Sequence, residues 1–61
     1  MRVFDLYMAF ENWEPESTFV LLEYAKEIWK GNWFQFPGCY YKEIVETFGV
    51  LQDGTIWIEI R

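Results

Sequence analysis

Cys39 carries the most reactive side chain in this sequence, because a deprotonated thiol is a strong nucleophile. It is the only cysteine, and the chain contains no histidine. A Cys-His or Ser-His catalytic pair is therefore excluded, as are a disulfide within the chain and a Cys/His zinc site. Cys39 follows Pro37-Gly38, where the start of a helix would lower its pKa. We nevertheless expect a small packed residue, and we predict no catalytic residue, metal or cofactor.

Closely spaced carboxylates are the other candidates for chemistry, at Glu14 and Glu16 and again at Glu43 and Glu46. Acid catalysis requires one carboxyl group that is desolvated, so that its pKa is raised. We expect these four in a loop and on a polar helix face, where water keeps them ionised. The glycines are scattered where turns and caps need them, so no glycine-rich phosphate loop is present. The sequence predicts that the chain is not an enzyme.

The segment of residues 11–16 is the first candidate binding surface. Glu11, Glu14 and Glu16 surround Trp13, and an aromatic anchor inside a charged rim is typical of a binding hot spot. The alternative is that Trp13 packs back onto the core ahead of a following helix.

A second candidate surface follows if the first and last strands of the chain pair. Tyr7 and Trp57 would then share the outer face of the sheet with Asp5 and Glu59. Aromatic residues on a face that is normally polar predict that something covers them. The candidates are a second helix, a second copy of the chain or another protein.

The first two elements that position these residues are expected to be a strand and a long helix. Residues 2–10 alternate, with Phe4, Leu6, Met8 and Phe10 on one face, which predicts a strand. From Pro15 or Ser17 to Lys30, apolar residues recur at helical spacing, which predicts a long amphipathic helix ended by Gly31. The stripe comprises Leu21, Leu22, Ala25, Ile28 and Trp29.

The second half of the chain predicts more strands. Residues 33–36 are an aromatic run before Pro37-Gly38 and favour a short strand. Residues 41–48 favour a short second helix, with one long strand from Tyr40 as the alternative. Residues 50–52 and 55–60, joined by Asp53-Gly54, predict a hairpin with a type I′ turn. Its last strand would turn Ile56, Ile58 and Ile60 inward.

These elements predict one two-layer α+β domain over residues 1–61, with a mostly antiparallel sheet of three or four strands. The order is strand-helix-strand-helix-strand-strand, or strand-helix-strand-strand-strand if the second helix is extended. A chain this small has a thin margin of stability. Four Trp, four Tyr and six Phe residues suit an aromatic-rich core.

Charge limits the partners. Ten acidic and five basic residues give a net charge of −5, which disfavours direct binding to nucleic acid or anionic membranes. No apolar stretch is long enough to span a membrane, and Asp5 interrupts any signal peptide. Together with the unpaired thiol, these features predict a cytoplasmic protein.

We therefore expect a small acidic protein-binding module that docks on a basic surface of a partner protein. Nucleic-acid-binding enzymes have such surfaces, so the chain would act as an inhibitor and DNA mimic. In size and composition alone it is similar to small phage-encoded viral inhibitors that occupy the DNA-binding sites of host enzymes. The alternative is a structural or assembly subunit, a homodimer that buries Tyr7 and Trp57 in a two-fold interface.

Overall fold

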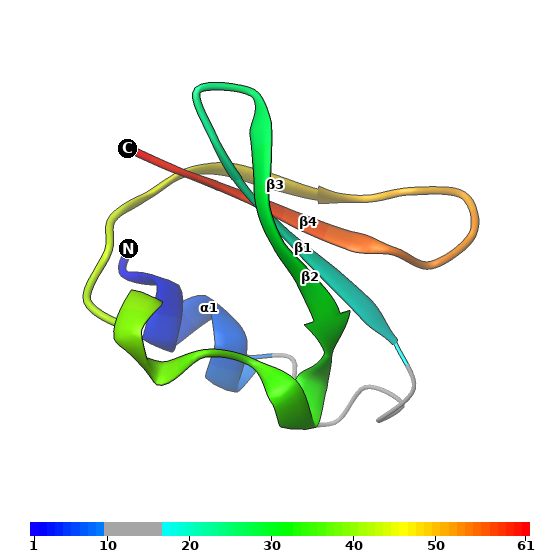
Figure 1. Cartoon of the computed structure of the whole chain (residues 1–61), viewed down its shortest axis with the longest axis horizontal. Coiled ribbons are helices and arrows are strands. Elements are labelled where there is room, and N and C mark those ends of the chain that lie inside the picture. Colours follow the sequence, from blue (N-terminus) through cyan, green and yellow to red (C-terminus); the bar gives the residue numbers. More distant parts are fainter. Residues whose placement is uncertain (10–16) are drawn as a thin grey trace.

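In the described part of the chain, the fold consists of a mixed four-stranded sheet and one short helix (Figure 1). The computed structural model describes residues 1–9 and 17–61. The elements are α1 (Val3–Ala9), β1 (Thr18–Glu23), β2 (Lys26–Asn32), β3 (Val45–Val50) and β4 (Ile56–Ile60). Two short 3₁₀ turns, Trp33–Gln35 and Gly38–Tyr40, lie between β2 and β3. The prediction of a small sheet with helix on one face is confirmed only in this coarse form, because the helix among the described residues has seven residues and no long helix is present there.

The strand predicted over residues 2–10 is wrong, because Val3–Ala9 form α1. Val3, Leu6 and Tyr7 are its buried residues, and their spacing of three and four suits a helix as well as alternation suits a strand. Groups far along the chain favour the helix over the strand. The N–H groups of Val3 and Phe4 donate to the carbonyls of Glu43 and Tyr41 at 2.9 and 3.1 Å, respectively. These bonds satisfy donors that a helix N-terminus leaves without partners.

The long helix predicted to end at Lys30 is also wrong, because that segment forms the antiparallel hairpin of β1 and β2. Tyr24 and Ala25 make the turn with φ angles of 53° and 63°. A two-residue turn with both φ values positive normally uses Asn or Gly. Neither is present, so the sequence carries no turn signal there.

The region after β2 differs from prediction as well. Residues 33–35 form a 3₁₀ turn and not a strand. The preferred helix over residues 41–48 is wrong, since β3 occupies Val45–Val50, which agrees in part with the extended alternative. The residue Val45 is anchored to the start of the chain, because its N–H donates to the Met1 carbonyl at 2.9 Å.

The hairpin of β3 and β4 is confirmed, but its turn is of another type. Gly54 has φ of 90°, whereas Asp53 is not among the positive-φ residues, so the type I′ prediction is wrong. The Gly54 N–H donates to the Leu51 carbonyl at 2.9 Å, and the Leu51 N–H donates to the Thr55 carbonyl at 2.8 Å. These bonds are typical of a type I turn followed by a left-handed glycine.

The sheet has the strand order β2-β1-β4-β3. Its outer pairs are antiparallel, whereas the central strands β1 and β4 are parallel. Chain segments more than thirty residues apart therefore meet at the centre, where Phe19 lies opposite Ile56 and Leu21 opposite Ile58. The β1 strand and the last strand of the chain form the middle of the sheet, which leaves β2 and β3 as its edges.

The core lies between the sheet and the layer of α1 and the 3₁₀ turns (Figure 1). The inward turn predicted for Ile56, Ile58 and Ile60 is confirmed, since all three are buried. The other buried core residues are Val3, Leu6 and Tyr7 of α1, Phe19 and Leu21 of β1, and Phe36. Phe36 joins the layers, with its ring centroid 5.1 Å from that of Trp29 and 4.8 Å from that of Tyr7.

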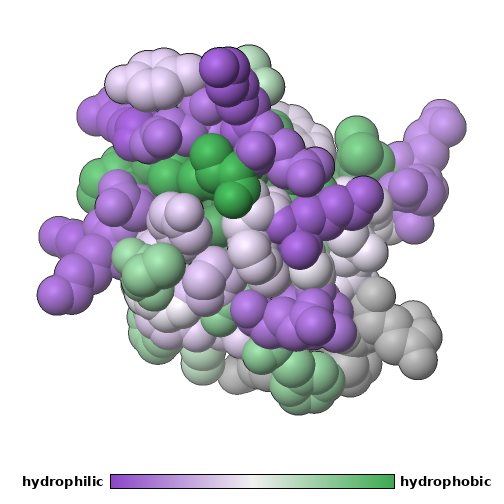
Figure 2. All heavy atoms as spheres, viewed as in Figure 1, coloured by the Kyte–Doolittle hydropathy of each residue, from purple (hydrophilic) through white to green (hydrophobic). Residues whose placement is uncertain are grey.

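The helical layer does not cover the whole sheet. Phe48 and Val50 of edge strand β3 are 44% and 48% exposed. Figure 2 shows hydrophobic atoms reaching the surface in a band between hydrophilic side chains. Within the described residues, no helix has the length and apolar composition needed to cross a membrane.

Candidate functional site

The residues predicted to bind a partner do not form one surface. Glu11, Trp13, Glu14 and Glu16 lie outside the described residues. Asp5 lies in α1, where its Oδ2 atom accepts a hydrogen bond from the Arg2 N–H at 3.2 Å. This bond is one half of a capping box, so Asp5 has a local role at the start of the helix.

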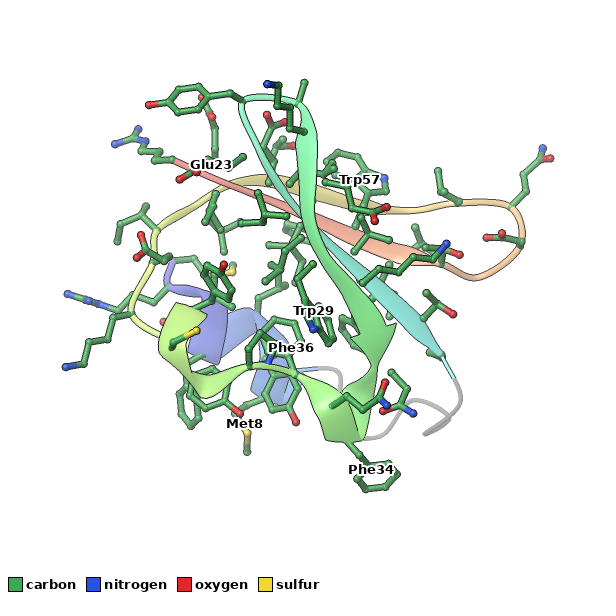
Figure 3. The ribbon with its side chains drawn as sticks, in the orientation of Figure 1. Met8, Glu23, Trp29, Phe34, Phe36 and Trp57 are labelled. Carbon is green, nitrogen blue, oxygen red and sulfur yellow. The ribbon has the colours of Figure 1, made fainter. Side chains whose placement is uncertain are left out.

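Tyr7 and Trp57 lie on opposite sides of the sheet, which corrects the expectation that they share its outer face. Tyr7 is 7% exposed and packs among Phe19, Phe36 and Tyr41. Burial raises the pKa of its hydroxyl, and the adjacent Tyr41 hydroxyl adds to the effect. In Figure 3, Trp29 and Phe36 lie between the layers, whereas Trp57 lies on the side of the sheet away from α1.

The outer face around Trp57 has a regular arrangement that follows from the strand register. One row across the sheet contains Lys30, Val20, Trp57 and Gly49. The next row contains Glu27, Leu22, Glu59 and Thr47. Alternate residues of β1, β3 and β4 share a face, and a register shift between Leu21 and Leu22 brings Glu27 of β2 opposite Leu22. The two rows therefore lie side by side on the face opposite the core.

A groove of about 610 Å³ crosses this face. Its apolar lining includes Val20, Leu22 and Trp57, and its ends include Ala25 of the β1–β2 turn and Leu51 of the β3–β4 turn. The volume lies within the range of about 300–1,000 Å³ that is common for ligand sites. The groove therefore provides an apolar surface in the middle of an otherwise polar face.

Charged groups line the same groove, namely the carboxylates of Glu27, Asp53 and Glu59 and the ammonium group of Lys30. The Thr55 N–H donates to Asp53 Oδ1 at 2.9 Å and lowers the pKa of Asp53, with a smaller contribution from Lys30. The negative charge of Asp53 and the positive charge of Lys30 thus offset one another. Glu27 and Glu59 leave the groove with a net negative charge.

Glu59 also stabilises the groove. Its Oε2 atom accepts a hydrogen bond from the Ala25 N–H at 3.2 Å. The bond joins β4 to a turn thirty-four residues earlier in the chain, at a position where the backbone has positive φ. The predicted binding residues Trp57 and Glu59 therefore line one groove.

Sequence reasoning missed the groove residues of β1, β2 and their turn, because it assigned residues 17–30 to a helix. Leu22 and Ala25 were expected in the apolar stripe of that helix. The run of β-branched, aromatic and aliphatic residues from Thr18 to Leu22 would have indicated a buried strand. The helical spacing of Leu21, Ala25 and Ile28 outweighed that short signal.

The candidates for chemistry in the described residues are Cys39 and the acidic side chains. Cys39 is exposed, so the expectation that it is packed is wrong. Across residues 1–9 and 17–61, no group of three or more His, Cys, Asp or Glu side chains is arranged to hold a metal ion. Comparison with protein families, curated proteins and solved structures gives no match. The groove on the outer sheet face is the surface on which a functional argument rests.

Proposed function

We propose that this chain is a small protein-binding module whose outer sheet face docks on a basic surface of a partner protein. The observation that carries the proposal is the groove, where the apolar surface of Val20, Leu22 and Trp57 is bordered by three carboxylates and one ammonium group. Tryptophan is enriched among the residues that contribute most to protein interfaces. Trp57 is the anchor in this proposal, and the carboxylates select the charge of the partner.

The electrostatics of the whole chain support the same partner. A net charge of −5 attracts positively charged proteins and accelerates their association at low ionic strength. Binding surfaces for nucleic acids are rich in Lys and Arg. Occupation of such a surface would make the chain an inhibitor of a nucleic-acid-binding enzyme. We place this interaction in the cytoplasm, where Cys39 stays a free thiol.

A homodimer through the aromatic outer face has less support than the sequence suggested. Tyr7 is buried in the core, so the outer face has lost one of the two aromatic residues of that hypothesis. The groove is also acidic, so two copies placed face to face would bring like charges together. Analytical ultracentrifugation decides this point, because a concentration-dependent dimer that Trp57→Ala abolishes would favour the homodimer.

The proposal is tested by affinity capture from a cell extract with the immobilised chain. Wild type and Trp57→Ala are compared at low and high salt, and the retained proteins are identified by mass spectrometry. We expect a basic protein that wild type retains at low salt and that is lost both at high salt and with Trp57→Ala. Retention that is equal for the two proteins would contradict the proposal. Circular dichroism of Trp57→Ala checks that the fold is intact.

A further inference from the structure

The row of Glu27, Leu22 and Glu59 has a more specific chemistry than the groove as a whole. Leu22 pairs with Glu27 on one side and with Glu59 on the other. Two strand spacings therefore separate the backbones of the two glutamates, which is roughly 10 Å. Both side chains line the same groove. The apolar side chain of Leu22 thus lies between two carboxylates.

We propose that this row binds a single arginine or lysine side chain of the partner, an inference that rests on the proposed function. The aliphatic part of the side chain lies on Leu22, Val20 and Trp57, and its cationic group lies between Glu27 and Glu59. Long basic side chains commonly combine an apolar stem with a charged end in this way. Arginine is favoured, because its planar guanidinium has five donors and stacks on aromatic rings.

The other end of the groove is less suited to a cation. Lys30 lies in the adjacent row, next to Val20, and its charge helps to lower the pKa of Asp53. A positively charged ligand there would meet an ammonium group of the chain itself. The row of Glu27 and Glu59 supplies two carboxylates, whereas the row of Lys30 supplies an ammonium group. The cation is therefore assigned to the Glu27–Glu59 end.

Glu59 is prepared for this role by its own hydrogen bond. The Ala25 N–H donates to Oε2 at 3.2 Å, which orients the carboxylate and leaves Oε1 for the ligand. Substitution of Glu59 with Gln keeps an oxygen acceptor for Ala25 and removes the charge. Glu59→Gln and Glu27→Gln are therefore the appropriate variants.

The experiment is an NMR titration of the ¹⁵N-labelled chain with the peptide acetyl-Gly-Leu-Arg-Gly-amide. Its counterparts carry lysine or the neutral isostere citrulline in place of arginine. We expect affinity to fall in the order arginine, lysine, citrulline, with amide shifts at Leu22, Ala25, Glu27 and Glu59. Each Gln variant should weaken the arginine peptide by about two- to five-fold, the size of an exposed ion pair. Lys30→Gln should strengthen it.

Glu43→Gln is the matched control, because it makes the same change of net charge at an exposed residue outside the groove. Equal weakening by Glu43→Gln and Glu27→Gln would overturn the inference, since only net charge would then matter. Equal affinity for the arginine and citrulline peptides, or no binding of either, would also overturn it. If Trp57→Ala abolished peptide binding while Glu27→Gln and Glu59→Gln bound as tightly as wild type, the peptide would bind in the groove but the cation site would be rejected. The proposed function is judged separately, by the capture experiment.

Discussion

The indole ring of Trp57 lies against the backbone of Gly49 across the β3–β4 pair. A Cβ atom added to Gly49 would lie 2.7 Å from Cζ2 and 2.9 Å from Nε1 of Trp57. These distances are too short for any Cβ contact, so only glycine admits the ring at this position. An aromatic ring that covers a glycine in an edge strand is a known means of stabilising such a strand. The same relationship sets the position of Trp57 in the groove.

The first prediction concerns Gly49→Ala. The added methyl group displaces the Trp57 ring, so we expect the free energy of unfolding to fall by about 1–3 kcal/mol, as for other overpacked sites. Urea unfolding followed by circular dichroism measures this loss. Trp57→Val combined with Gly49→Ala should cost less than the sum of the single changes, because the clash is then absent.

Gly38→Ala is the control for this prediction. A Cβ atom at Gly38 would lie 3.5 Å from the Tyr41 ring, an ordinary contact, and its φ is not positive. We expect no loss of stability, or a small gain through the unfolded state. Similar losses in the two variants would show that the Trp57 contact does not decide the cost.

The β1–β2 turn carries a cost that substitution should remove. Tyr24 and Ala25 both have positive φ, a conformation that costs a residue with a Cβ atom roughly 1–2 kcal/mol. Replacing Tyr24-Ala25 with Asn-Gly should therefore raise the free energy of unfolding by about 1–2 kcal/mol. The backbone N–H at position 25, which in wild type donates from Ala25 to Glu59, is present in the variant as well. Chemical denaturation tests the gain, and an unchanged or lower stability would be inconsistent with this geometry.

The lowered pKa of Asp53 predicts that the stability of the fold depends on pH in the acidic range. Its pKa is lowered below the ordinary value of 3.8 in the folded chain, first of all by the Thr55 N–H. Its stabilising effect is therefore complete above pH 3.8 and is lost as the pH falls through the lower folded value. Wild type should exceed Asp53→Ala in stability at neutral pH, and the difference should shrink as the pH falls below 3.8. A difference that is independent of pH would mean that the charge of Asp53 has no part in the turn.

The raised pKa of Tyr7 predicts that the stability of the fold decreases as the pH rises in the alkaline range. Burial raises its pKa above 10.0, so the neutral hydroxyl stabilises the fold below pH 10.0, and this contribution is lost as the pH rises through the folded value. Tyr7→Phe should lower the free energy of unfolding by about 1 kcal/mol at neutral pH, because a hydrogen bond is lost. At alkaline pH the variant should resist unfolding better than wild type, because it has no hydroxyl to ionise. Tyr24→Phe is the control, because Tyr24 is 82% exposed. Thermal unfolding across alkaline pH values separates the two variants.

Local sequence signals predicted the β3–β4 hairpin and the inward face of β4. Ile56, Ile58 and Ile60 alternate without interruption after Asp53-Gly54, and their burial follows directly from the pleat of a strand. Trp57 and Glu59 were placed on the outer face for the same reason. These features depend only on neighbouring residues, which is why sequence patterns were sufficient for them.

The rest depended on contacts between distant segments. Residues 3–9 suit either a strand or a helix, and the carbonyls of Tyr41 and Glu43 favour the helix by accepting from its first N–H groups. The β1–β2 turn lacks glycine and asparagine, and Glu59 stabilises it from β4. The parallel pairing of β1 with β4 places Val20 and Leu22 beside Trp57 and Glu59. The sequence alone therefore determined the charge and the final hairpin, whereas only the tertiary structure assembled the groove, because its residues come from strands whose pairing no local pattern encodes.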